Sequence, residues 1–219
     1  MHPLFAVGLD PQGILEWFGS LAFVGLLAIV FAESGIMIGF VLPGDSLLFV
    51  AGLLAYTGTQ PDSAALMPNI ALVSLGCFIA AAAGDQVGYV FGSRVGSRIF
   101  DRPASRLFKP AHLRRSEEFF DKHGPKTIIL ARFVPIVRTF APIVAGAGKM
   151  HHRTFTAYNL VGAFLWAVGL TQAGYWLGHA FPKLGDNIEL AVVAIVALSL
   201  VPVTIEIIRN RRRSRASSN

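Results

Sequence analysis

The chain is organised as long apolar stretches separated by polar connectors. Three of these stretches hold 22 to 28 residues with little charge, at about 69–93, 154–181 and 187–208. An apolar helix of this length crosses about 30 Å of hydrocarbon. The pattern therefore predicts three simple transmembrane helices.

Two further apolar stretches, at about 18–56 and 127–148, are interrupted by helix-breaking residues. Proline disrupts helical hydrogen bonding, and non-helical backbone at membrane depth is tolerated only where protein or water satisfies it. We therefore predict that both stretches form re-entrant hairpins. The predicted breaks are Pro43, Gly44, Pro135 and Pro142.

Composition supports a membrane protein. Hydrophobic residues make up 53% and charged residues 15% of the chain, and the mean hydropathy is +0.57. Soluble domains carry about 25% charged residues, and disordered chains have low hydrophobicity and high net charge. Both classes are excluded, and the single cysteine excludes a disulfide scaffold.

The net charge of +6 is distributed unevenly along the chain. No Lys or Arg precedes Arg94, whereas residues 94–126 hold nine and Arg209–Arg215 holds five. These basic clusters flank apolar stretches, so we expect them to be cytoplasmic and to contact anionic lipid rather than nucleic acid. The C-terminus is then cytoplasmic. The N-terminal orientation is left open, because a full crossing by residues 18–42 would reverse it.

An internal repeat relates two of the predicted helices. Gly76–Gly92 and Gly162–Gly178 are identical at seven of 17 positions without a gap. We expect the two helices to cross in opposite directions, which makes the repeat inverted, as in many secondary transporters. A chance likeness between glycine-rich apolar helices is the alternative.

Small residues recur every fourth position along the first of these helices. Such a stripe favours close packing against neighbouring helices. Its members are Gly76, Ala80, Gly84, Gly88 and Gly92.

Together these patterns predict an all-α polytopic membrane protein built from an inverted repeat. Each half consists of a re-entrant helical hairpin and a transmembrane helix, and an extra C-terminal transmembrane helix follows. An amphipathic surface helix is expected at 112–123. The predicted single domain, 1–208, divides into repeat one (about 15–93), repeat two (about 112–181) and the extra helix (about 187–208), followed by a basic cytoplasmic tail at 209–219.

Four charged residues lie inside the predicted hairpins: Glu33 and Asp45 in the first, and Arg132 and Arg138 in the second. Each charge costs about 2.5–3.5 kcal/mol at the centre of a membrane, so such residues are usually functional. The arginine fork binds phosphate or carboxylate bidentately, and a carboxylate in a low-dielectric cavity can exchange protons. The alternative is a static group of salt bridges that ties the hairpins together.

Asp85 is a candidate accessory residue. Its predicted place, near the cytoplasmic end of its helix, suggests that it caps the helix or pairs with Arg94 or Arg98.

His151 and His152 have no third ligand at a suitable spacing, so we expect no metal and no cofactor. No catalytic motif is present, and the hairpins contain no histidine for lipid-phosphate chemistry, so we expect no enzyme. Trp17, Trp166 and Trp176 could be interfacial anchors or core.

Several segments resemble the DedA family, the bacterial branch of a wider superfamily with the VTT domain. They are FVLPGDSLLFVAGLLA at Phe40–Ala55, GDQVGYVFGSRVG at Gly84–Gly96, FFDKHG at Phe119–Gly124 and ARFVPIVRTFAPIVAGAGKM at Ala131–Met150. The resemblance implies a multi-pass protein of the bacterial inner (plasma) membrane that acts in envelope homeostasis and proton-dependent transport. It also implies two re-entrant hairpins and functional roles for the four hairpin charges.

The resemblance further implies a proton-coupled flippase that recycles undecaprenyl phosphate for cell envelope synthesis. Arg132 and Arg138 would hold the phosphate, while Glu33 and Asp45 would exchange protons. The alternatives are a passive phospholipid scramblase, a proton-coupled exporter of small solutes or cations, and a structural protein. The sequence leaves open which lipid or solute is moved and whether the chain forms a homo-oligomer.

Overall fold

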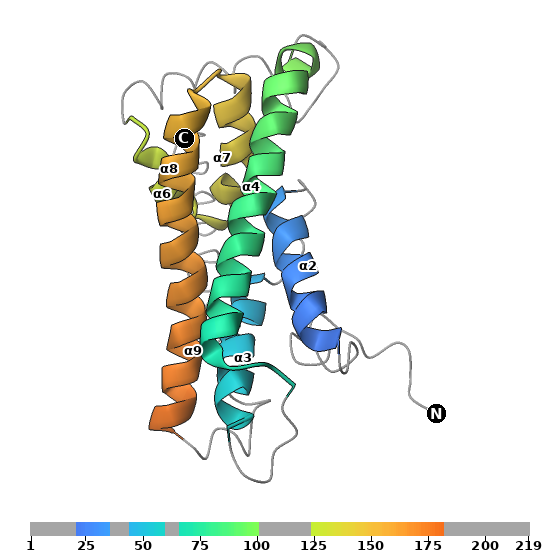
Figure 1. Cartoon of the computed structure of the whole chain (residues 1–219). Helices are drawn as coiled ribbons and strands as arrows, with labels where there is room; N and C mark the ends of the chain where they lie inside the picture. Colours follow the sequence, from blue (N-terminus) through green and yellow to red (C-terminus); the bar gives the residue numbers. More distant parts are fainter. Residues whose placement is uncertain (1–20, 36–43, 60–65, 101–123, 182–219) are drawn as a thin grey trace, which may run out of the picture.

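The computed structural model describes residues 21–35, 44–59, 66–100 and 124–181, and within these ranges every regular element is a helix. Figure 1 shows them as a bundle of roughly upright helices. In chain order they are α2 (Ala22–Gly35), α3 (Gly44–Thr57), α4 (Ile70–Phe100), α6 (Thr127–Ala131), α7 (Pro135–Ala147), α8 (His152–Ala163), the π-helical turn η3 (Phe164–Val168) and α9 (Gly169–Ala180).

Two long antiparallel helices run from one end of the bundle to the other: α4, and the continuous run of α8, η3 and α9 (Figure 1). Their segments Ile70–Val95 and His152–Ala180 are apolar and long enough to cross a membrane. Large apolar side chains are exposed on both helices, as expected where a helix faces lipid. Those on α4 are Leu72, Leu75, Ile79, Val87 and Phe91, and those on the other helix include Leu160, Val161, Phe164, Leu165 and Trp176.

The shorter helices pack alongside the long ones. α3 packs against α9, and α7 packs against α4; Figure 1 shows α3 in the lower half of the bundle and α7 in the upper half. Backbones meet closely at both contacts, because a Cβ on Gly174 would lie 2.0 Å from the carbonyl oxygen of Phe49, and one on Gly92 would lie 2.1 Å from that of Ile143. Each contact joins a short helix of one predicted half to the long helix of the other.

The predicted packing role of the small-residue stripe on α4 is confirmed. Gly84 faces α2, where a Cβ would lie 2.5 Å from the carbonyl oxygen of Phe31, and Gly92 faces α7. The stripe therefore brings two helices against α4 at positions about two turns apart.

The described residues show a helix break at Pro135, whereas the break predicted at Gly44 adjoins residues outside the described ranges and stays a prediction. α7 begins at Pro135 and α3 begins at Gly44, and proline is well suited to the first position of a helix. Pro142, however, lies inside α7, which continues to Ala147, so the break predicted there was wrong. A helix within a packed protein can tolerate an internal proline, because neighbouring groups satisfy the freed carbonyl.

Several predicted features lie outside the described residues. These are Pro43, Trp17, the surface helix at 112–123, the extra helix at 187–208 and the tail at 209–219.

The glycine contacts predict a contrast between two alanine substitutions. Gly92→Ala should lower the midpoint of thermal unfolding in detergent, with a cost of about 1–3 kcal/mol, because the new Cβ collides with the backbone of α7. Gly169→Ala is the matched control, because no atom from another part of the structure lies within 4 Å of its Cβ position. Alanine there should be neutral or stabilising. Equal unfolding midpoints for the two variants would contradict the close packing of α4 and α7.

Candidate functional site

The four predicted hairpin charges and Asp85 lie in one cluster where the N-terminal ends of α3 and α7 meet. Asp45 is in the first turn of α3, Arg138 is in the first turn of α7, and these two residues form an ion pair. Glu33, near the C-terminal end of α2, reaches the same place. In Figure 1 this place lies at mid-height of the bundle, between α3 below and α7 above.

Arg138 binds two carboxylates at once. Its Nη2 donates to Oε1 of Glu33 and its Nη1 donates to Oδ1 of Asp45. Glu33 is buried, whereas the side chain of Asp45 is 33% exposed. The guanidinium therefore joins α2, α3 and α7 at a single point.

Glycine at position 44 is required by the position of Glu33. A Cβ on Gly44 would lie 1.4 Å from Oε2 of Glu33. The carboxylate therefore rests directly on the N-terminal backbone of α3, where the partial positive charge of the helix end stabilises an anion.

Arg132 forms the third ion pair of the cluster, with Asp85. Its Nη1 donates to Oδ2 of Asp85 and, at 2.8 Å, to Oδ1 of Asn159. Asn159 in turn donates to the carbonyl oxygen of Ala82 at 3.1 Å, which links α8 to α4. All three side chains of this group are buried.

The expected partners of Asp85 were wrong. Asp85 lies at the middle of α4, not near its end, because the helix continues to Phe100, beyond the predicted end at 93. Arg94 is exposed, and the buried carboxylate pairs instead with Arg132. The accessory residue therefore belongs to the centre of the site.

Trp166 and Asn159 are site residues that sequence reasoning did not identify. The Nε1 of Trp166 donates to Oδ1 of Asp45 at 2.8 Å. Its ring centroid lies 5.3 Å from the guanidinium carbon of Arg132 and 5.0 Å from that of Arg138. Two sequence features could have identified them: an asparagine within an apolar span, and a tryptophan at the repeat position where the first half has an alanine.

A small cavity lined by charged and apolar residues lies beside the cluster. It offers about 20 Å³ to the centres of water molecules, which is room for about one or two waters. It is lined by Glu33, Asp85, Arg132, Arg138, Pro142 and Trp166, among others. No group of three metal-ligating side chains occurs in the described ranges.

The Asp85–Arg132 pair generates a test by double substitution. Asp85→Asn should lower the free energy of unfolding by about 3–5 kcal/mol, because it leaves the buried Arg132 without a compensating charge. Adding Arg132→Gln should recover part of that loss, as measured by thermal unfolding in detergent. Arg94→Gln, at an exposed position, should change little. Strictly additive effects at positions 85 and 132 would contradict the pairing.

Comparison with known proteins identifies the family. Residues 42–176 match the VTT domain. The chain is 46% identical over 195 residues to Protein DedA of Escherichia coli (strain K12), covering 89% of this chain and 86% of that protein. It is 42% identical over 211 residues to an uncharacterized membrane protein of Mycobacterium tuberculosis (strain ATCC 25618 / H37Rv), covering 94% and 89%.

A third relative, Inner membrane protein YqjA of Escherichia coli (strain K12), is 32% identical over 205 residues, covering 92% of this chain and 88% of that protein. No solved structure was found to match the chain. Two of these relatives are named as membrane proteins, in agreement with the two membrane-length apolar helices. The chain therefore belongs to the DedA family of VTT-domain membrane proteins.

Proposed function

We propose that this protein is a proton-coupled flippase that returns a polyprenyl phosphate, with undecaprenyl phosphate as the expected lipid, across the bacterial inner membrane. The observation that carries the proposal is the pairing of Arg138 with two carboxylates, Glu33 and Asp45, beside a small cavity in the apolar bundle. Transport requires no chemical step, so the protein would not be an enzyme.

The surroundings of Arg138 suit a phosphate group. Two guanidiniums and the N-terminal ends of α3 and α7 meet there, and both kinds of group attract anions. Broken helices whose N-termini face an anionic substrate are a recurring feature of secondary transporters. Carboxylates now occupy the positions that phosphate oxygens would take.

The balance of charges supports coupling to protons. Three carboxylates face two guanidiniums, which gives a net charge of −1 when all five groups are ionised. A phosphate that replaced Glu33 and Asp45 on Arg138 would add further negative charge in a region where charge is costly. Proton uptake by the released carboxylates removes that cost, so phosphate binding and proton binding should occur together.

The cavity must enlarge before it can hold a phosphate. Its present space suits water, so this conformation corresponds to a closed, ion-paired state. We infer that opening occurs as the two halves, an inverted repeat of re-entrant hairpins, move against each other. This repeat is supported by the close glycine contacts of α3 with α9 and of α7 with α4, each of which joins one half to the other. The C-terminus would be cytoplasmic, by the distribution of basic residues.

A structural role for the cluster is the second candidate. The observation that favours it is that Arg138 joins three helices through its two ion pairs. In that case exchanging the two residues, Asp45→Arg with Arg138→Asp, should restore a fold that either single change disrupts. Under the transport proposal, the exchanged protein should fold without transporting lipid.

The transport proposal predicts a specific loss in Arg138→Gln protein. Purified protein is reconstituted in liposomes, and movement of undecaprenyl phosphate is followed with and without a pH gradient. The variant should move the lipid at least about tenfold more slowly, since a charge-assisted hydrogen bond contributes about 1.5–3 kcal/mol. Arg94→Gln, exposed on α4, is the matched control and should retain wild-type transport.

The dependence of lipid movement on the pH gradient distinguishes the remaining alternatives. Lipid movement by the wild-type protein that ignores the pH gradient would indicate a passive scramblase. Unchanged transport by Arg138→Gln protein would contradict the phosphate-binding role. If folded wild-type protein moves no lipid, a proton-coupled exporter of small solutes or cations becomes the better account, and Glu33 and Asp45 should then matter more than the arginines.

A further inference from the structure

Trp166 contacts both ion-paired groups of the cluster. Its indole N–H binds Asp45, and its ring lies within cation–π distance of Arg132 and Arg138. The side chain is only 4% exposed. The ring therefore connects the group around Arg138 with the group around Arg132.

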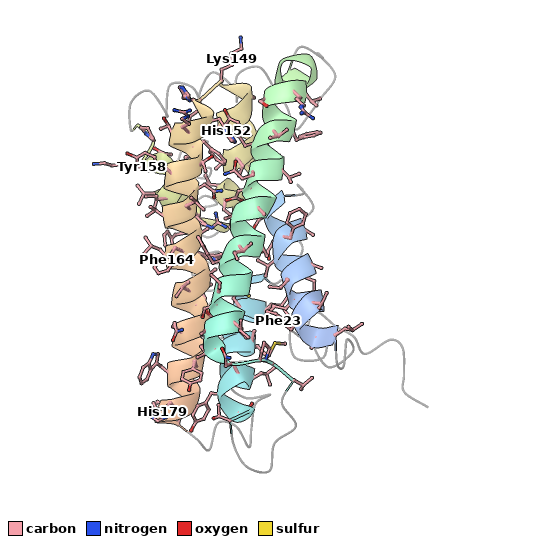
Figure 2. The ribbon with its side chains drawn as sticks, in the orientation of Figure 1. Phe23, Lys149, His152, Tyr158, Phe164 and His179 are labelled. Atoms are coloured by element: carbon pink, nitrogen blue, oxygen red, sulfur yellow. The ribbon has the colours of Figure 1, made fainter. Side chains whose placement is uncertain are left out.

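The backbone at Trp166 is also unusual. Trp166 is the middle residue of η3, the only π-helical turn among the described residues. A π-helical turn changes the direction of the side chains that follow it and is frequent at functional sites. Phe164, in the same turn, packs edge-to-face on Phe78 of α4 with ring centroids 5.9 Å apart. Figure 2 labels Phe164 near mid-height of the long helix.

The first half of the chain lacks both the tryptophan and the π-helical turn at the equivalent position. In the aligned repeat, Trp166 corresponds to Ala80, which lies in the regular helix α4. A repeat unit of this kind can therefore form without the tryptophan or the π-helical turn. Both occur where the repeat meets the charged cluster.

We propose that Trp166 is the positioning residue of the lipid-phosphate site, which deepens the function proposed above and rests on it. Its ring holds the two guanidiniums at a fixed spacing, and its N–H holds Asp45 in the phosphate-free state. An indole N–H can only donate, so its partner must be an acceptor. When a phosphate replaces Asp45 on Arg138, a phosphate oxygen becomes the acceptor.

Two substitutions distinguish the contribution of the indole ring to binding from that of its N–H group. Trp166→Phe keeps an aromatic face and loses the donor, whereas Trp166→Leu keeps apolar bulk and loses both. Binding of farnesyl phosphate to the full-length protein in detergent is measured by calorimetry, and folding is checked by thermal unfolding. Trp166→Leu should weaken binding about tenfold, through the loss of two cation–π contacts. Trp166→Phe should stay within about threefold, because the N–H has an acceptor in both the free and the bound state and its loss weakens both. Trp176→Phe, exposed on the same helix, is the matched control.

Trp166 fluorescence gives a readout that a merely structural role would not change. The chain has three tryptophans, so Trp17→Phe with Trp176→Phe leaves Trp166 as the only emitter. Its emission should shift when farnesyl phosphate is added, and also when Asp45→Asn is introduced without ligand. A protein that keeps only Trp176 should show neither shift.

The outcomes distinguish the two proposals. Equal affinity in Trp166→Leu and wild-type protein, or constant Trp166 emission while calorimetry records binding, would overturn the positioning role and leave the proposed function intact. An affinity loss as large in Trp166→Phe as in Trp166→Leu would overturn the role given to the ring. Wild-type protein that binds no farnesyl phosphate would overturn the proposed function and, with it, the lipid-phosphate role of Trp166.

Discussion

The ion pairs of Arg138 are the interaction on which the rest of the site depends. A guanidinium stays protonated, so within an apolar bundle it must always have an anionic partner. Here the partners come from α2 and α3, while the arginine itself comes from α7. This requirement brings the N-terminal ends of two helices together beside the small cavity.

The same requirement explains why the site can change its state. An arginine with two carboxylate partners can release one or both of them only if another anion replaces them and the released groups become neutral. A phosphate supplies the anion, and protons neutralise the carboxylates. The third pair, Arg132 with Asp85, is held by Asn159 and is more deeply buried. The Arg132–Asp85 pair is therefore suited to stay together while the partners of Arg138 exchange.

The cost of inserting charge into a membrane was enough to identify Glu33, Asp45, Arg132 and Arg138 from the sequence, and the structure places them in one cluster. Their pairing could not be predicted, because it depends on how the helices meet in three dimensions. Asp85 was assigned to a helix end because the length of α4 was underestimated. Trp166 was undecided, because the acceptor for its indole N–H lies on another helix, and which helix that is depends on the tertiary fold. The C-terminal predictions concern residues that the structure does not describe.

The central claim is that phosphate replaces carboxylates on Arg138 and that those carboxylates take up protons. The most direct measurement is the number of protons exchanged when farnesyl phosphate binds, obtained by calorimetry at pH 8 in buffers of different ionisation enthalpy. We expect net proton uptake by the wild-type protein and a smaller uptake by Asp45→Asn and Glu33→Gln proteins. Binding with no net proton uptake, or with the same uptake in all three proteins, would contradict the account.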